Sequence, residues 1–134
     1  MKKYVDVFLK VLLSLIMILP IGGALHLFPA PTQDMYSNPD AFAFISMIMG
    51  PAAYIDYTMV VVFAIALFLL WTRRTALAVL LILPITVNVI GFHLFLDGGI
   101  FVPGSIPADI MVALNLYFLW QYRAQYMPLL GKRV

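Results

Sequence analysis

Four apolar segments dominate the sequence and limit the folds that the chain can adopt. They cover residues 4–28, 51–71, 75–96 and 107–126. A membrane core of about 30 Å is crossed by a helix of roughly 20 apolar residues. Only 10% of the residues are charged, against about a quarter in a soluble domain. The sequence therefore predicts an all-α integral membrane four-helix bundle, with a single transmembrane domain over residues 1–134.

The basic residues indicate how these segments cross the membrane. If the four segments cross the membrane one after another, all of the basic residues lie on one side of it, and the two loops on the other side contain none. The basic residues are Lys2, Lys3, Lys10, Arg73, Arg74, Arg123, Lys132 and Arg133. Because cytoplasmic loops are enriched in Lys and Arg, we expect both termini in the cytoplasm and the protein in the bacterial inner (cytoplasmic) membrane. The start of the chain also resembles a signal peptide, but the apolar run is long enough to span, so we favour a first transmembrane helix.

Most of the acidic residues lie toward the outer side of the membrane in the same arrangement: Asp34, Asp40, Asp56, Asp97 and Asp109. The exception is Asp6, which lies four residues before Lys10. Residues four apart are neighbours on a helix surface. We therefore expect Asp6 to pair with Lys10.

A shorter apolar run precedes the second long segment. Residues 40–49 follow Asn38-Pro39, and Gly50-Pro51 separates them from the second span. This run is too short to cross a membrane, and Gly-Pro pairs mark breaks between elements. The sequence therefore predicts a short outer interfacial helix before the second span.

Ionisable groups recur near the outer ends of the spans, where an unpaired polar group is costly. His26 and His93 are the two histidines of the chain, and Leu-Phe follows each of them. Asp97 lies four residues after His93 and shares its helix face, whereas Asn88 points elsewhere. Asp56 lies early in the second span. We predict a polar pocket that opens toward the outer leaflet and binds a ligand through these side chains: His26, His93, Asp97, Asn88 and Asp56.

The two histidines allow four interpretations. They can fix the bundle through interhelical hydrogen bonds, or bind the polar head of a ligand such as a quinone carbonyl or a lipid headgroup. Bis-histidine haem b requires two opposed imidazoles, and a metal site would use His26, His93 and Asp97. The spacing favours the first two interpretations over haem and metal. Asp56 is either an outer-interface residue or a proton-relay partner of His93.

Other recognised chemistry is missing from the sequence. The chain has no cysteine, which excludes thiolate zinc sites and cysteine-ligated iron–sulfur clusters. It has no Gly-rich phosphate loop, H-E-x-x-H motif or nucleophile elbow. Because the basic residues mark orientation, we expect no nucleic-acid partner. These observations lean against an enzymatic function.

Three stretches of the sequence resemble small DoxX-like membrane proteins, and the resemblance covers about residues 8–130. The most specific stretch runs from Asn88 to Asp97 in the third span. This chain has Asp56 and Met59 where such relatives often carry a Lys and a Glu. The other two stretches are Gly-x-x-His-Leu-Phe-Pro at residues 23–29 and the C-terminal close at Tyr122-Arg123 with Tyr126-x-Pro128-Leu129-Leu130.

The resemblance implies a four-helix bundle and a limited set of functions. The DoxX superfamily includes a subunit of a thiosulfate:quinone oxidoreductase, together with accessory or assembly factors for other membrane proteins. We therefore expect a non-catalytic binder of a hydrophobic small molecule, a quinone or a lipid, or a small accessory subunit of a larger membrane complex. The alternative is a redox subunit of a quinone-linked membrane oxidoreductase, with His93 handling the proton. Membrane lipids, and either a homodimer or a larger complex, are the expected partners.

Overall fold

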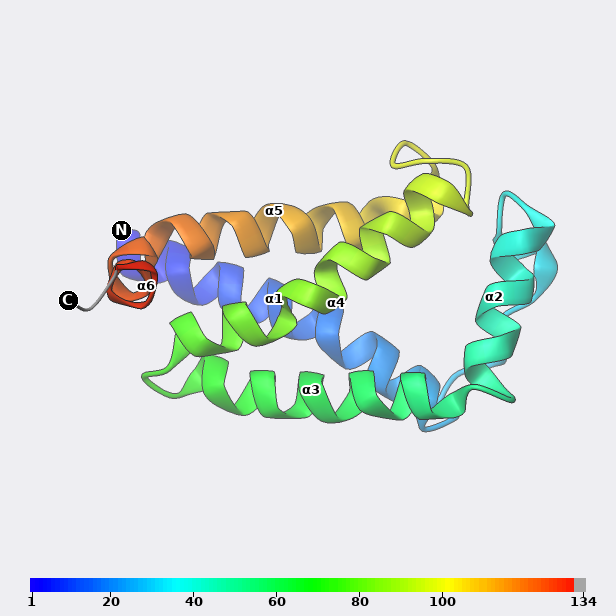
Figure 1. The fold of residues 1–134 in the computed structure, drawn as a ribbon, viewed down its shortest axis with the longest axis horizontal. Helices are drawn as coiled ribbons and strands as arrows, with labels where there is room; N and C mark the ends of the chain where they lie inside the picture. Colours follow the sequence, from blue (N-terminus) through cyan, green and yellow to red (C-terminus); the bar gives the residue numbers. More distant parts are fainter. Residues whose placement is uncertain (132–134) are drawn as a thin grey trace.

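The computed structural model describes residues 1–131, and the regular elements in this range are helical. Four helices lie side by side (Figure 1): α1 (Lys2–Ala24), α3 (Ala53–Trp71), α4 (Thr75–Phe95) and α5 (Ile106–Gln121). Two shorter helices lie at opposite ends of this group, α2 (Pro39–Met49) and α6 (Arg123–Leu130). Single 3-10 turns occupy the two loops at the α2 end, η1 (Gln33–Met35) and η2 (Pro103–Ser105).

The four long helices form a closed bundle. α3 and α4 make an antiparallel hairpin, α4 also packs on α5, and α1 packs on both α3 and α5. All four contribute to one apolar core, whose largest fully buried side chains are Leu13, Met17, Phe63, Leu70, Val79, Ile82 and Phe118. The predicted packing of apolar segments into one helical unit is therefore present.

Three of the helices are long and apolar enough to cross a membrane: α1, α3 and α4. Their outward surfaces carry large exposed apolar side chains, among them Phe8, Leu15, Val61, Ile65, Phe68, Leu77 and Val87. Contiguous apolar surface of this kind is rare on soluble monomers. The helices therefore indicate a multi-pass membrane protein. α5 has 16 residues and a length of about 24 Å, which is shorter than the hydrocarbon core of a bilayer.

The ends of the first and fourth predicted spans differ from the helices observed. α1 ends at Ala24 rather than near residue 28, and the fourth segment breaks at Tyr122, where α5 gives way to α6. Arg123 stabilises this break, because its Nη1 donates to the Trp120 carbonyl (2.8 Å) and its guanidinium stacks 4.4 Å from the Trp120 ring centroid. The predicted interfacial helix at 40–49 corresponds to α2, and it lies across the end of the bundle (Figure 1).

Interhelical hydrogen bonds connect the long helices, and two of them involve Trp71 and Asn115. Trp71 Nε1 donates to Ser14 Oγ (2.9 Å) and joins α3 to α1. Asn115 Nδ2 donates to the Val79 carbonyl (3.3 Å) and joins α5 to α4. Bonds of this type between membrane helices contribute about 0.6 kcal/mol on average, so most of the packing energy comes from the apolar core.

Charge is segregated along the bundle. The basic residues of the described chain lie in the N-terminal half of α1, in the α3–α4 turn and in α6, at the end where the chain begins and ends (Figure 1). Asp6 is the acidic residue at this end. Its Oδ2 lies 3.4 Å from Lys10 Nζ, which confirms the predicted pair, and its Oδ1 accepts a hydrogen bond from Gln121 Nε2 (3.0 Å).

Candidate functional site

His93 and Asp97 form a buried pair at the end of α4. His93 lies in the last turn of the helix, and Asp97 follows the residue that caps it. His93 Nδ1 lies 2.9 Å from Asp97 Oδ2, and the two residues are 9% and 2% exposed. The predicted shared face of residues four apart is confirmed. Because a carboxylate only accepts, the imidazole donates this bond from Nδ1.

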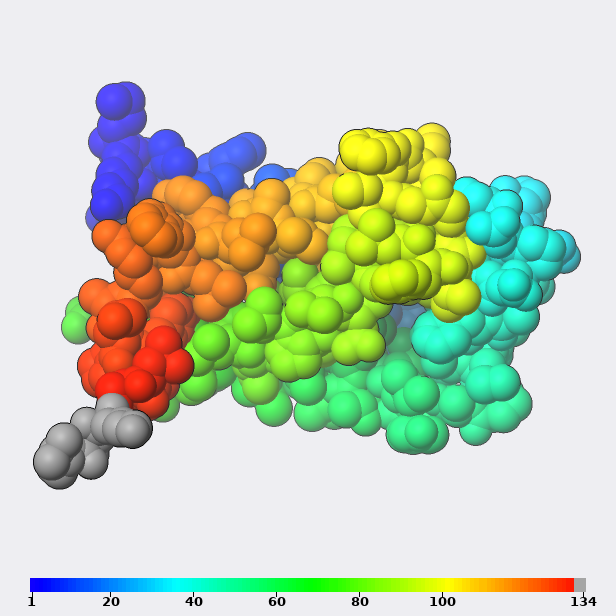
Figure 2. All heavy atoms as spheres, turned by 45° about the horizontal axis from the view of Figure 1, so that its top comes forward, coloured from blue at the N-terminus to red at the C-terminus, as the bar shows by residue number. Residues whose placement is uncertain are grey.

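The second oxygen of Asp97 binds the segment that leads into α2. The Ser37 backbone N–H donates to Asp97 Oδ1 (2.8 Å), and Asn38 Nδ2 donates to the Leu96 carbonyl (3.1 Å). Gly98, with φ +87°, allows the close approach, because a Cβ there would lie 3.0 Å from Ser37 Cβ. Figure 2 shows the loop after α4 in contact with the segment around α2. We call this arrangement the α4–α2 latch: His93, Asp97, Ser37 and Asn38.

Aromatic rings cover the latch. The Phe92 ring packs edge-on against both Tyr36 (6.2 Å between centroids) and His93 (5.1 Å), and it also contacts Phe44 (5.8 Å). Burial raises the pKa of the Tyr36 phenol above its ordinary value of 10.0, and the nearby Asp97 carboxylate raises it further. The surroundings therefore favour a neutral phenol beside a charged carboxylate.

His26 lies outside the helix that was expected to carry it. The Leu27 N–H donates to the Gly22 carbonyl (2.9 Å) and the His26 N–H to the Gly23 carbonyl (3.0 Å), which is the Schellman arrangement that ends helices. His26 takes the left-handed position of this motif, with φ +57°. Glycine usually occupies that position, since other residues pay about 1–2 kcal/mol there. The side chain is exposed.

The two histidines differ in their contacts with carboxylates. His93 bonds to Asp97, whereas no hydrogen bond or ion pair joins His26 to Asp56 among the described residues, and the Asp56 carboxyl, in the first turn of α3, is near enough only for a longer-range charge interaction. Asn88 is exposed on α4, and its Nδ2 donates to a backbone carbonyl of its own helix (2.8 Å). The structure thus brings together His93 and Asp97 from the predicted set, leaves His26 and Asp56 without a direct contact, and leaves Asn88 apart, pointing away from His93 as expected.

The ligand set considered for a metal is not assembled. Within residues 1–131, no three side chains of the types His, Cys, Asp and Glu come close enough to hold one ion. Asp97 already accepts from His93 and from Ser37. His26, His93 and Asp97 therefore do not form a three-residue metal site in this arrangement.

An apolar crevice lies between the four long helices, and the sequence reasoning did not identify it. Its volume is about 200 Å³. Met59 lies one helical turn after Asp56, so the α3 side of the crevice begins about 4.5 Å from Asp56 along the helix axis. The sequence feature that could have indicated this crevice is Pro20, which lies inside α1. The lining side chains are Ile16, Leu19 and Pro20 from α1, Met59 and Phe63 from α3, Val89 from α4, and Pro107, Ala108 and Met111 from α5.

Comparisons with protein-family models, with curated proteins and with solved structures find no match. The geometry itself therefore carries the functional inference. It consists of a polar latch between α4 and the segment before α2, a strained and exposed histidine after α1, and an apolar crevice that begins one helical turn after Asp56.

Proposed function

We propose that the protein is a DoxX-like, multi-pass protein of the bacterial inner membrane that binds a hydrophobic small molecule, a quinone or a lipid, without acting on it. The observation that carries the proposal is the apolar crevice of about 200 Å³ lined by α1, α3, α4 and α5. Ligand sites are typically apolar, with a few polar groups that fix orientation. The basic end of the bundle supports cytoplasmic termini through the positive-inside rule.

The size of the crevice favours the tail of an amphiphile over a whole ligand. Sites for drug-sized molecules enclose about 300–1,000 Å³, and this crevice has about 200 Å³. A tail that moves from lipid into the crevice exchanges one apolar environment for another, so its burial contributes little net free energy. Selectivity must therefore come from the fit of the crevice and from polar groups at its end.

His26 and Asp56 are the polar groups that we assign to the ligand head. Asp56 lies about one helical turn before Met59 at the crevice, and His26 is exposed near the end of α1. A strained backbone persists where the surroundings or a function require it, and glycine at residue 26 would remove the strain of φ +57°. An imidazole can donate to a quinone carbonyl or an ester, and a carboxylate can accept from a hydroxyl.

We assign His93 and Asp97 to the latch rather than to the ligand. Both oxygens of Asp97 already accept hydrogen bonds, one from His93 and one from Ser37. Replacing either bond with a ligand contact would release the segment before α2. Asn88 lies on the exposed side of α4, and we give it no part in binding.

The test is binding of two probes by the full-length protein in mild detergent, read by native mass spectrometry. Decylubiquinone represents a quinone and palmitic acid represents a lipid chain. Leu19→Trp fills the crevice from its exposed edge, and Ala108→Trp fills it from the buried side. Each is expected to lower occupancy of the bound probe at least tenfold. Ala64→Trp adds the same bulk to the exposed side of α3 and is expected to change nothing.

His26→Gly separates the imidazole from the backbone. It keeps the left-handed turn without its cost, and it is expected to weaken the bound probe about fivefold, the value of one hydrogen bond. Equal loss in Ala64→Trp, or no binding of either probe, would overturn the proposal. A protein that binds neither probe but co-purifies with a second polypeptide would favour the accessory-subunit role.

A further inference from the structure

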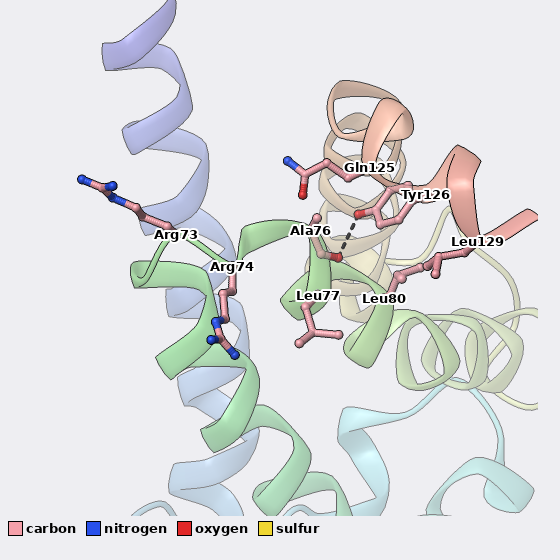
Figure 3. Close-up of a pocket in the computed structure, with 8 residues that line it drawn as sticks. All are labelled: Arg73, Arg74, Ala76, Leu77, Leu80, Gln125, Tyr126 and Leu129. Carbon is pink, nitrogen blue, oxygen red and sulfur yellow. Dashed lines mark hydrogen bonds between the residues drawn. The ribbon is translucent and has the colours of Figure 1, made fainter.

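A second cavity lies at the basic end of the bundle, between the first turns of α4 and helix α6 (Figure 3). It encloses about 240 Å³. The Tyr126 hydroxyl donates to the Ala76 carbonyl (2.8 Å), which holds α6 against α4 and maintains one wall. Leu77, Leu80 and Leu129 supply the apolar part of the lining. This cavity is separate from the crevice of the proposed function. It lies at the basic end of the bundle, which is the end opposite α2.

Two arginines that have no acidic partner among residues 1–131 border this cavity. Arg73 and Arg74 come from the α3–α4 turn, and Figure 3 shows their side chains extending in different directions away from Gln125 and Tyr126, so that they lie at the rim of the cavity. Both are exposed, and the ion pairs found within residues 1–131 involve other side chains. A guanidinium binds phosphate through paired hydrogen bonds. The cavity therefore presents positive charge on one side and leucine side chains on another.

The order of these groups along the bundle resembles the order of groups in a phospholipid. Leu77 and Leu80 lie three and six residues after Arg74, or about 4.5 and 9 Å further into the bundle by helical rise. α6 lies across the end of the bundle (Figure 1) and exposes Met127 and Leu130, as an interfacial helix does. A soluble phosphate would gain nothing from the leucines, whereas an acyl chain would pack on them.

We propose that this cavity binds one anionic glycerophospholipid. Its phosphodiester lies against the guanidinium groups of Arg73 and Arg74, and the Gln125 amide donates to an oxygen of the glycerol or head. The first carbons of one acyl chain pack along Leu77 and Leu80. The site differs from general attraction to a charged surface, because it combines charge with an enclosed apolar wall.

The experiment measures binding of phosphatidylglycerol and of phosphatidylcholine with the same acyl chains. The full-length protein in mild detergent is titrated with each lipid and read by native mass spectrometry. The variant Arg73→Gln/Arg74→Gln is expected to weaken phosphatidylglycerol binding about 25-fold, or about fivefold for each arginine. Lys2→Gln/Lys3→Gln removes the same charge from the same end, away from the cavity, and is expected to have no more than a twofold effect.

Tyr126→Phe tests the cavity without changing its charge. It removes the bond to the Ala76 carbonyl, and it is expected to weaken phosphatidylglycerol binding several-fold as α6 separates from α4. Unchanged binding in this variant would overturn the proposal, as would equal losses in the arginine and lysine variants. Equal affinity for phosphatidylcholine would indicate an acyl groove alone, and displacement by millimolar glycerol phosphate would indicate a soluble phosphate site. Either result refutes the lipid site.

Discussion

The α4–α2 latch predicts that replacing Asp97 with alanine releases α2 without unfolding the bundle. The substitution removes the acceptor of the Ser37 N–H (2.8 Å) and of His93 Nδ1 (2.9 Å), and the carboxylate is only 2% exposed. Hydrogen bonds to charged groups contribute about 1.5–3 kcal/mol each. Of these two bonds, the one from Ser37 joins Asp97 to the segment before α2, and at the lower value it contributes about 1.5 kcal/mol, so its loss raises the local opening equilibrium about tenfold.

Cysteine labelling measures this opening directly. The chain has no cysteine of its own, and Ala41, in the first turn of α2, is 0% exposed. Ala41→Cys therefore becomes reactive toward a maleimide only when α2 leaves the bundle. In the full-length protein, Asp97→Ala is expected to speed its labelling about tenfold. Phe101→Cys, at a position 96% exposed, is expected to label at one rate in both backgrounds.

Asp109→Ala is the matched control. Asp109 Oδ2 lies 3.0 Å from the Ser105 hydroxyl at the same end of the bundle, and it has no hydrogen bond to the segment before α2 among the described residues. Labelling that does not change with Asp97→Ala, or that rises equally with Asp109→Ala, would refute the latch. A double-mutant cycle between His93→Ala and Asp97→Ala is expected to give a coupling of at least about 1 kcal/mol.

Three further predictions concern α1, Tyr36 and the bundle core. Gly23→Ala places a Cβ in open space and is expected to stabilise α1 by about 0.5–1 kcal/mol, whereas Gly22→Ala would place it 2.5 Å from the Phe28 ring. In thermal unfolding, Gly22→Ala should therefore be the less stable of the two by about 1 kcal/mol. The raised pKa of Tyr36 means that stability from its neutral phenol is present below pH 10.0 and is lost as the pH rises through the folded value. Tyrosinate absorbance should show a late-titrating phenol that Tyr36→Phe removes. Asn115 Oδ1 is buried without a hydrogen-bond partner among residues 1–131, and such an acceptor costs about 1–3 kcal/mol. Asn115→Leu should therefore be neutral or stabilising, and a loss above about 1 kcal/mol in denaturant unfolding would show that this oxygen has a partner.

The helices were predictable from the sequence where local signals mark their ends. α2 begins at Pro39 and ends at Gly50, both of which are strong local signals. The break at Tyr122 was not predictable, because the residues around it, Trp120-Gln121-Tyr122-Arg123-Ala124, include neither glycine nor proline. It depends on how Arg123 lies over Trp120 and bonds to its carbonyl, which is a contact that spacing and composition do not specify.

The candidate site was predictable only where its partners share one helix turn. The His93–Asp97 pair follows from the four-residue spacing, but the bond from Ser37 to Asp97 joins residues 60 positions apart. Both histidines are followed by Leu-Phe, and this shared sequence suggested equivalent roles for them. Gly22 accepts the Schellman bond that ends α1 before His26, whereas α4 continues through His93. The same His-Leu-Phe sequence therefore adopts different conformations at the two positions, because the residues before it differ.

The two histidines lie in different environments, and we expect them to have different roles. His93 is buried, and its partner Asp97 is saturated with hydrogen bonds, so a change there acts first on the position of α2. His26 is exposed and strained, and it lies outside the helices that line the apolar crevice. Apolar burial discriminates poorly between ligands that already reside in lipid. If the crevice binds such a ligand as we propose, discrimination comes from an exposed polar group, and we assign that role to His26 rather than to His93, which is buried and bonds to Asp97.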